Sequence, residues 1–223
     1  MPSKPRWVVS PPPDPALVRE YAGEFGLAPV VVSLALQRGY TEREQIEQFL
    51  YPRLKDLSDP FLLPGVDAAV KRILRAIDDG ESVVLYGDYD VDGVSSLTLL
   101  CTVLRAYGLD PHPFLPTRLE EGYGLSVKGI ENCLGGHLPD LLIAADCGTN
   151  SCAEAKLLCE KGIDLIILDH HEPSPEGVAE CVALVNPKLG EDFHYLCTAG
   201  VVFKIAHALL RARPVAGFDL KDH

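Results

Sequence analysis

From residue 66 onward, short apolar runs of strand length alternate with longer segments of helix length. The runs SVVLYG, PHPFLP, DLLIAAD, DLIILD and CVALVN are bounded by turn-forming residues, and such runs predict strands, mostly buried ones. Helices are predicted between and around them, over 66–79, 94–107, 127–134, 151–162 and 198–212. This alternation is typical of a parallel β-sheet with helices on both faces. We therefore expect an α/β fold.

Residues 1–63 have a different character and are predicted to form a small helical N-terminal segment. Helices are predicted over 16–25, 29–39 and 41–50, the last starting at Thr41 with the capping-box pattern T-E-R-E. The following stretch, YPRLKDLSDPFLLPG, holds three prolines and a glycine, which is typical of a domain boundary. We therefore divide the chain into a lead-in over 1–63 and an α/β domain over 64–223.

Composition narrows the function classes. The chain has 223 residues, of which 47% are hydrophobic, so it can bury a sizeable core. No run of 18 apolar residues occurs, and no membrane span is expected. The formal charge of −12 counts against a simple nucleic-acid-binding module with surplus basic residues, although bound cations could neutralise part of it. Seven cysteines without a C-x-x-C pair favour free thiols in the cytoplasm over disulfides or structural zinc.

Three aspartates alternate in GDYDVDG, residues 87–93, and two kinds of site can begin in this way. A calcium-binding EF-hand loop starting at Asp88 would need a glutamate at its twelfth position, where Leu99 stands. The segment before Asp88 is also predicted to be a strand rather than a helix. A carboxylate cluster at the end of a buried strand is therefore the better interpretation. Gly93 is expected to free the backbone to turn, and Ser95 and Ser96 to open a helix.

Aspartate and histidine follow three of the predicted strands. Asp90 and Asp92 follow the first, Asp146 ends the second, and the triplet Asp169-His170-His171 ends the third. The carboxyl ends of parallel strands meet at one edge of the sheet, where ligands bind in open α/β folds. Taken singly, an aspartate at a strand end is usually a helix cap or a turn former, and for Asp88 both interpretations stay open.

Several carboxylates gathered at one edge repel one another unless a cation lies between them. Oxygen-rich ligands with one or two imidazoles suit Mn²⁺ or Mg²⁺ better than a thiolate-loving metal. Two such ions would form a centre that hydrolyses phosphoesters. The pattern of strand ends therefore predicts a metal-dependent hydrolase.

Three segments resemble the first three motifs of the DHH phosphoesterases: GDYDVDGVSS, ADCGTNS and LDHHEPS. Within that superfamily the chain is similar to the RecJ-type exonucleases, which degrade single-stranded DNA from 5′ to 3′. The segments PTRLEEGYGLS, LVNPKL and YLCTAGVVFKIAHAL resemble further parts of that family, and the N-terminal helices also fit it. The resemblance covers nearly the whole chain.

The resemblance implies a role for each residue of these motifs. It implies metal ligands for two Mn²⁺ or Mg²⁺ ions at Asp90, Asp92, Asp146 and His170, and a catalytic His171 beside the scissile phosphate. Asp88 and Asp169 are expected to be further ligands or to hold the ligands in place. A water acidified by the two cations would be the nucleophile.

Two residues of the loop between motifs are expected to bind substrate. Arg118 is expected to contact a phosphate and Tyr123 to stack on a base; the alternative is an arginine paired with Glu120 or Glu121 and a packed tyrosine.

Some relatives carry histidine at the position of Tyr86, so a site in this chain must function without that imidazole.

The resemblance also implies a biological setting. It implies a hydrolase that releases 5′ mononucleotides from single-stranded DNA in recombination and repair, with single-stranded-DNA-binding protein and a RecQ-type helicase as partners. Relatives continue into a fourth motif, which supplies one more metal-binding aspartate, and into a C-terminal domain that helps hold DNA. No residue of this chain is assigned to that motif, so we expect an N-terminal part of a RecJ-like protein. Whether this part is active alone stays open.

Two other functions remain as alternatives. The same site could hydrolyse short oligonucleotides, cyclic dinucleotides or pyrophosphate, although pyrophosphatases of this superfamily usually begin almost at their first motif. A catalytically incomplete module could instead bind DNA or a protein. Substrate length distinguishes the first alternative, and the number of bound metal ions distinguishes the second.

Overall fold

The computed structural model describes residues 8–117, 122 and 124–220. The chain forms two compact units, Met1–Ser58 and Asp59–His223. The division predicted between residues 63 and 64 stays a prediction.

The first unit is a small helical cluster. Its helices are α1 (Pro15–Phe25), α2 (Pro29–Gln37) and α3 (Arg43–Leu50), and a 3₁₀ turn, η1 (Leu54–Asp56), follows them. The Asp14 side chain caps α1 by accepting a hydrogen bond from the backbone N of Ala16 at 2.9 Å. The apolar faces of the three helices enclose a small core of buried side chains: Val18, Val32, Ala35, Leu36 and Ile46.

The start of α3 differs from the prediction. The helix begins at Arg43 rather than at Thr41, and Glu42 is its N-cap. The Gln45 side-chain oxygen accepts hydrogen bonds from the backbone N of Thr41 at 3.0 Å and of Glu42 at 3.1 Å. The capping box therefore joins Glu42 and Gln45, because the amide of Gln45 reaches both backbone donors that precede the helix.

The second unit is an α/β domain. Its sheet has five parallel strands in the order β2-β1-β3-β4-β5. The strands are β1 (Val83–Gly87), β2 (His112–Phe114), β3 (Leu141–Ala145), β4 (Asp164–Leu168) and β5 (Ala183–Val185). The helices are α4 (Val66–Asp79), α5 (Val91–Ala106), α6 (Val127–Leu134), α7 (Cys152–Glu160) and α8 (Thr198–Ala212), with 3₁₀ turns η2 (Pro60–Leu62) and η3 (Pro187–Leu189). The predicted fold class is confirmed.

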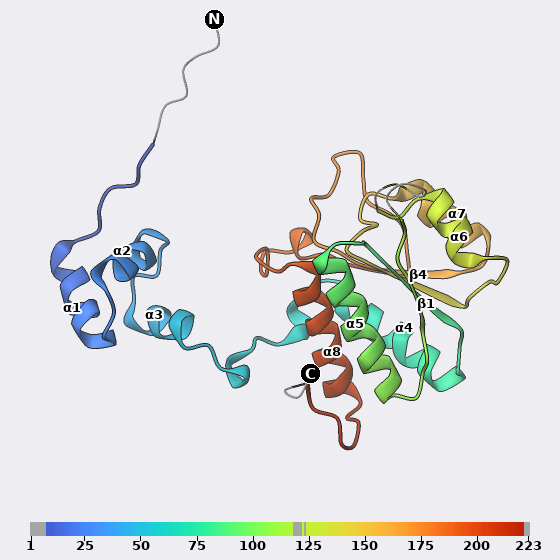
Figure 1. Cartoon of the computed structure of the whole chain (residues 1–223), viewed down its shortest axis with the longest axis horizontal. Coiled ribbons are helices and arrows are strands. Elements are labelled where there is room, and N and C mark those ends of the chain that lie inside the picture. Colours follow the sequence, from blue (N-terminus) through green and yellow to red (C-terminus); the bar gives the residue numbers. More distant parts are fainter. Residues whose placement is uncertain (1–7, 118–121, 123, 221–223) are drawn as a thin grey trace, which may run out of the picture. The chain divides into compact units, whose positions relative to one another are not determined.

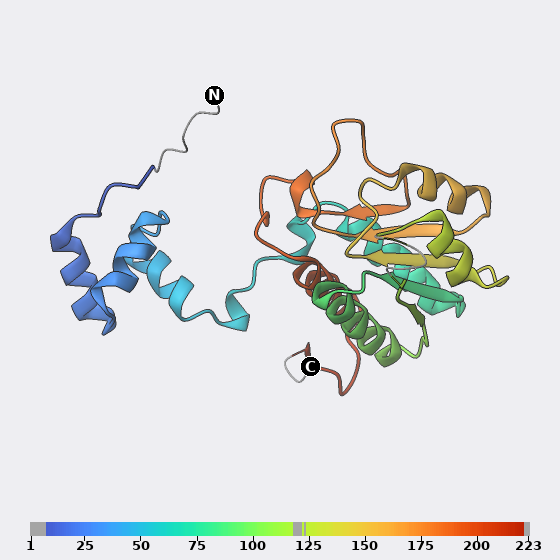
Figure 2. The same ribbon diagram turned by 45° about the horizontal axis from the view of Figure 1, so that its top comes forward.

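Helices cover both faces of this sheet. Figure 1 shows α4, α5 and α8 on one face and α6 and α7 on the other, and Figure 2 shows the same layers after rotation. Alternate residues of β1 enter different cores: Leu85 packs under α4, α5 and α8, whereas Val84 and Tyr86 pack toward α6 and α7. Every residue of β1 and β3 is buried, as expected for strands covered on both faces.

The register brings three strand ends level with one another. Gly87 at the end of β1 pairs with Ala145 of β3, and Ala145 pairs with Leu168 of β4. The next residues along the chain are Asp88, Asp146 and Asp169. Three carboxylates from distant parts of the sequence therefore lie at the same edge of the sheet.

Two further features concern the part of the chain that the structure describes. None of its helices combines the length and the apolar character needed to cross a lipid bilayer. Its seven cysteines are all free thiols, three of them buried.

Candidate metal centre

The connection from β1 to α5 positions the first aspartates. Asp90 is the N-cap of α5, and its Oδ1 accepts hydrogen bonds from the backbone N of Asp92 at 2.9 Å and of Gly93 at 3.0 Å. The amide of Gly93 holds the pKa of Asp90 below its usual range, against the opposing effect of burial. Asp90 therefore stays ionised while it serves as a helix cap.

The role of Gly93 differs from the one predicted. Because α5 begins at Val91 and not at residue 94, Gly93 lies in its first turn and its backbone is not in the left-handed region. A Cβ at this position would lie 2.2 Å from the carbonyl O of Asp88. Glycine is needed here because the helix approaches the end of β1 closely, not because the chain turns.

Asp146 lies at the centre of the site and is 2% exposed. Its backbone φ of 65° is in the left-handed region, which residues other than glycine seldom adopt. Its Oδ1 accepts a hydrogen bond from Thr198 Oγ1 at 2.8 Å. Burial raises the pKa of Asp146 to about 7; the charges of Asp92 and Asp90 add to this shift, and the Thr198 hydroxyl opposes it.

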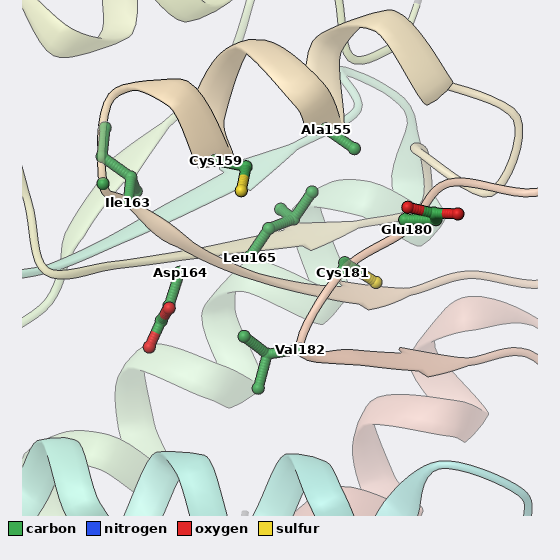
Figure 3. Close-up of a pocket in the computed structure, with 9 residues that line it drawn as sticks. Ala155, Cys159, Ile163, Asp164, Leu165, Glu180, Cys181 and Val182 are labelled. Carbon is green, nitrogen blue, oxygen red and sulfur yellow. The ribbon is translucent and has the colours of Figure 1, made fainter.

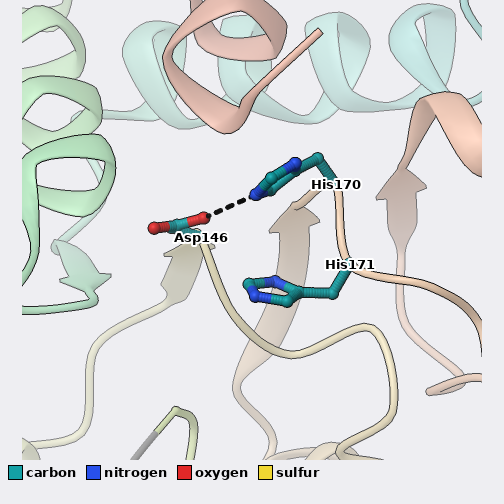
Figure 4. A group of neighbouring side chains, drawn as sticks. All are labelled: Asp146, His170 and His171. Carbon is teal, nitrogen blue, oxygen red and sulfur yellow. Dashed lines mark ion pairs between the residues drawn. The ribbon is translucent and has the colours of Figure 1, made fainter. Parts of the chain in front are cut away.

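The histidine pair follows β4. His170 Nε2 lies 3.6 Å from Asp146 Oδ1 and 3.7 Å from Asp92 Oδ2. His171 Nδ1 lies 2.7 Å from Asp169 Oδ1, which also accepts from the backbone N of His170 at 2.7 Å. Figure 4 shows His170 and His171 on the same side of Asp146, with the ion pair from His170 to Asp146 drawn as a dashed line.

Asp169 is buried and orients the ring of His171. Although burial alone would raise the pKa of Asp169, hydrogen bonds from Thr149 and His171 outweigh it and keep the pKa below its ordinary value. An ionised carboxylate can only accept, so Nδ1 of His171 donates. Burial lowers the pKa of His171, but the bond and charge of Asp169 reverse the shift, and the pKa is raised overall.

Among the described residues, two groups of potential ligand atoms share Asp146. One consists of Asp146, His170 and His171, and the other of Asp88, Asp90 and Asp146; within each group the atoms lie within 4.8 Å of one another. Such spacing fits a cation bound among carboxylate oxygens and imidazole nitrogens. The raised pKa of Asp146 also fits, because burial and the charges of Asp92 and Asp90 disfavour its ionised form, which a cation would stabilise.

Asp92 lies at the edge of these groups. Its Oδ2 accepts from the backbone N of Thr198 at 2.8 Å and its Oδ1 from the backbone N of Ala199 at 2.7 Å. The carboxylate thus caps the first turn of α8, where negative charge is favourable. Each oxygen keeps a further lone pair that could face a cation, so the ligand role of Asp92 remains a proposal.

Sequence reasoning missed three buried polar residues at the site. Thr149 donates its backbone N to Asp169 Oδ2 at 3.0 Å, and Asn186 donates its amide to the carbonyl O of His171 at 2.8 Å and to Thr149 Oγ1 at 2.9 Å. Thr198 binds Asp92 and Asp146 as described. The positions of Thr149 and Asn186 just after β3 and β5 were an available signal, since polar residues at that sheet edge tend to surround ligands.

The remaining residues singled out from the sequence are Tyr86, Arg118 and Tyr123. Tyr86 is fully buried, its ring centroid is 5.4 Å from that of Phe114, and its hydroxyl donates to the carbonyl O of Gly124 at 3.0 Å. The side chain at this position is therefore part of the core. Arg118 and Tyr123 lie outside the described residues.

A separate hollow lies at the opposite edge of the sheet. It is formed by α7, the start of β4 and the segment that precedes β5, and Figure 3 shows Cys159 and Cys181 among its lining residues with Ile163 and Leu165. Asp164, the first residue of β4, is part of its wall. The hollow is thus at the amino ends of the strands and does not belong to the candidate metal centre.

The hydrogen bond between Asp169 and His171 leads to a prediction about the imidazole. In metal-free protein, NMR titration should give a pKa for His171 above 6.5, and Asp169→Asn should lower it, because the variant removes the anion and leaves the effect of burial. Asp67→Asn, which changes an exposed i,i+4 pair with Lys71, is the control and should leave the His171 pKa unchanged. An unaltered His171 pKa in Asp169→Asn would contradict this account of the pair.

Comparison with known proteins adds evidence of a different kind. A family model described as DHH family, N-terminal domain, matches residues 82–219. The single-stranded-DNA-specific exonuclease RecJ of Bacillus subtilis is 36% identical over 98% of this chain and 28% of its own length. RecJ of Thermus thermophilus is 34% identical over 92% of this chain and 29% of its own length.

The fold is similar to a solved structure as well. The crystal structure of RecJ in complex with Mn²⁺ from Thermus thermophilus superposes with a TM-score of 0.71 at 29% identity, covering 93% of this chain and 29% of that one. The chain spans less than a third of the length of each of these relatives.

Proposed function

Because this chain belongs to the DHH family, we propose that it is a metal-dependent hydrolase that cleaves phosphodiester bonds of single-stranded DNA. The observation that carries this proposal is the position of Asp146, which is shared by two groups of ligand atoms at the edge where β1, β3 and β4 end. A residue common to two such groups suits a pair of cations, the arrangement used for phosphoester hydrolysis.

We assign the cations to residues of both groups. Those that would hold Mn²⁺ or Mg²⁺ are Asp90, Asp92, Asp146 and His170, with Asp88 as a further ligand or a support for Asp90. The donor atoms are carboxylate oxygens and imidazole nitrogen, which suit these ions, and the Thermus relative is described in complex with Mn²⁺. When bound, two such cations acidify water and neutralise the negative charge of a phosphate.

His171 is assigned the role of proton donor to the phosphate. Its Nδ1 is held by Asp169 Oδ1 at 2.7 Å, so the orientation of its ring is fixed. Its raised pKa means that more of it is imidazolium at a given pH than in an ordinary histidine. An imidazolium in this position donates a hydrogen bond to a phosphoryl oxygen or a proton to the leaving group.

The substrate and its polarity are inferred from the relatives. The proteins from Bacillus subtilis and Thermus thermophilus are named single-stranded-DNA-specific exonucleases, and we propose the same substrate here, attacked from 5′ to 3′ with release of 5′ mononucleotides. Phosphate binding by Arg118 and base stacking by Tyr123 remain part of this proposal. So do a role in recombination and repair, the cytoplasmic location, and single-stranded-DNA-binding protein and a RecQ-type helicase as partners.

The test is hydrolysis of 5′-phosphorylated single-stranded DNA with Mn²⁺. Release of 5′ mononucleotides is expected from the single strand and not from duplex DNA. Asp146→Asn should lower the rate about 100-fold or more, the scale of losing one preorganised charge-stabilising group. Asp110→Asn, at an exposed aspartate paired with Arg105, should hydrolyse DNA like the wild type.

Three other results would contradict the proposal. Equal rates on duplex and single strand would reject the substrate, and faster hydrolysis of dinucleotides than of long strands would support the small-substrate alternative. If neither this chain nor a longer product of the same gene that includes a fourth motif releases nucleotides, the hydrolase assignment itself is wrong.

A further inference from the structure

The start of α8 holds two carboxylates that come from different elements. Thr198, the first residue of α8, is fully buried. Its backbone N donates to Asp92 Oδ2 and its Oγ1 donates to Asp146 Oδ1, both at 2.8 Å. These partners lie 106 and 52 residues away along the sequence. One residue therefore joins the first turn of α5 to the end of β3.

The hydroxyl of Thr198 has a defined direction. Thr198 is buried and Asp146 is 2% exposed, so little water is available to replace the bond between them. When Asp146 is ionised it can only accept, and the threonine must be the donor. The same Oδ1 lies 3.6 Å from His170 Nε2. The bond from Thr198 therefore fixes the rotation of the Asp146 carboxylate and decides which oxygen lies beside His170.

Asp146 needs such a support more than an ordinary aspartate does. Its backbone is in the left-handed region, at φ 65°, so the peptide geometry that aims its side chain is a strained one. The backbone N of Asp146 is held by the carbonyl O of Leu168 at 2.9 Å. The carboxylate itself accepts from Thr198 Oγ1 and shares a further hydrogen bond with the side chain of Asp90.

Asp92 is fixed by the same helix end. Cys197, the N-cap of α8, makes no side-chain hydrogen bond to the first turn. The carboxylate of Asp92 takes that place by accepting from the backbone N of Thr198 and of Ala199. Helix start and carboxylate thus orient each other.

We propose that Thr198 is a positioning residue of the metal centre, whose hydroxyl sets the rotation of Asp146 and whose backbone, with Ala199, sets that of Asp92. This inference rests on the proposed function in so far as Asp146 binds a cation. The side chain of Thr198 acts through Asp146 and is not assigned as a ligand. Outer residues of this kind typically change metal affinity by about 10- to 100-fold when they are removed.

The test compares Mn²⁺ binding by calorimetry in three variants of Thr198. Thr198→Val keeps the volume and removes the hydroxyl, Thr198→Ser keeps the hydroxyl and removes the methyl, and Thr198→Ala removes both. Thr198→Val and Thr198→Ala should each weaken Mn²⁺ binding about 10-fold or more, whereas Thr198→Ser should stay within about threefold of the wild type. Thr102→Val is the matched control, because its hydroxyl bonds the carbonyl O of Thr98 within α5.

A purely structural role predicts a different order. If Thr198 only fills space, Thr198→Val should bind Mn²⁺ like the wild type, and Thr198→Ser and Thr198→Ala should share whatever defect appears, because both lose the methyl. That order, or equal affinity in all variants, would overturn the proposal. If Thr198→Val fails to fold, Thr198→Ser decides the question, because the proposal expects it to bind Mn²⁺ nearly like the wild type, whereas a space-filling role expects it to share the defect of Thr198→Ala.

The outcome is separable from that of the proposed function. Wild-type protein that binds Mn²⁺ with the predicted order of variants, yet hydrolyses no DNA, would reject the nuclease and keep the role of Thr198. If the wild type hydrolyses DNA but Thr198→Val and Thr198→Ser bind Mn²⁺ equally well, the nuclease assignment is kept and the role of Thr198 is rejected. If the wild type binds no Mn²⁺, the metal centre is rejected and the role of Thr198 falls with it.

Discussion

Asp146→Asn is expected to stabilise the metal-free protein at pH 8 and to abolish its stabilisation by Mn²⁺. The reason is that burial, together with the charges of Asp92 and Asp90, raises the pKa of Asp146 to about 7. An ionised carboxylate at this position is therefore unfavourable until a cation neutralises it. Asparagine keeps an oxygen that can accept from Thr198 but carries no charge.

The sign of the pH dependence follows from linkage. The folded state holds the proton of Asp146 more tightly than the unfolded chain, where the pKa is near 3.8. Its contribution to the free energy of unfolding is therefore fully present below pH 3.8 and is lost as pH rises to about 7. Between pH 5 and pH 8 the metal-free wild type should lose about 3 kcal/mol through this group, at ~1.4 kcal/mol per unit.

The measurement is urea unfolding of EDTA-treated protein at pH 5 and pH 8. His171, whose pKa is also raised, loses its own stabilising contribution as pH rises through that pKa. The test is therefore the difference between wild type and Asp146→Asn, with Asp110→Asn, at an exposed side chain, as the control. Equal pH dependence in wild type and Asp146→Asn would show that Asp146 does not carry the unfavourable charge.

Addition of Mn²⁺ at pH 8 tests whether the charge of Asp146 is needed for stabilisation by the metal. A ligand that binds only the folded state stabilises it by RT ln(1 + [L]/Kd), or ~2.7 kcal/mol at 100 times Kd. Wild type and Asp110→Asn should gain on this scale, and Asp146→Asn should gain little. If Asp146→Asn is more stable than the wild type without Mn²⁺ and gains little stability from Mn²⁺, the charge of Asp146 destabilises the metal-free protein and serves to bind a cation.

The layers of the fold and the meeting of the strand ends could be predicted because their causes are local. The apolar runs that form β1, β3 and β4 are buried on both faces, and parallel strands place their carboxyl ends at one edge. Asp146 and His170 were therefore expected to lie close together, and they do. The alternation of side chains along β1 would also have indicated that Tyr86 and Leu85 face different cores.

What could not be predicted depends on how distant elements pack. The capture of Asp92 by the start of α8 requires α5 and α8 to lie side by side, and no local pattern connects residues 92 and 198. The bond between Thr198 and Asp146 has the same origin. The start of α5 was placed too late because the sequence GDYDVDG contains a glycine, which usually marks a turn, whereas here it permits a close approach.

Gly93→Ala tests that close approach, and it should destabilise the α/β unit by ~3 kcal/mol, the upper part of the range for overpacking. The added Cβ would lie 2.2 Å from the carbonyl O of Asp88 and 2.7 Å from its backbone N. These are backbone atoms of the strand end and cannot rotate away, so the first turn of α5 must move and take Asp90 and Asp92 with it. Mn²⁺ affinity should therefore fall together with stability.

Helix propensity alone predicts the opposite result for Gly93→Ala, because alanine in a helix interior is favoured over glycine by about 0.5–1 kcal/mol. Gly23→Ala in α1 provides the matched control, since nothing lies within 4 Å of its added Cβ; it should stabilise its helix by that amount and leave Mn²⁺ binding unchanged. If Gly93→Ala instead unfolds at the wild-type urea midpoint and binds Mn²⁺ normally, the end of β1 can yield to α5. The carboxylates would then owe their positions to the start of α8 rather than to the junction of β1 and α5.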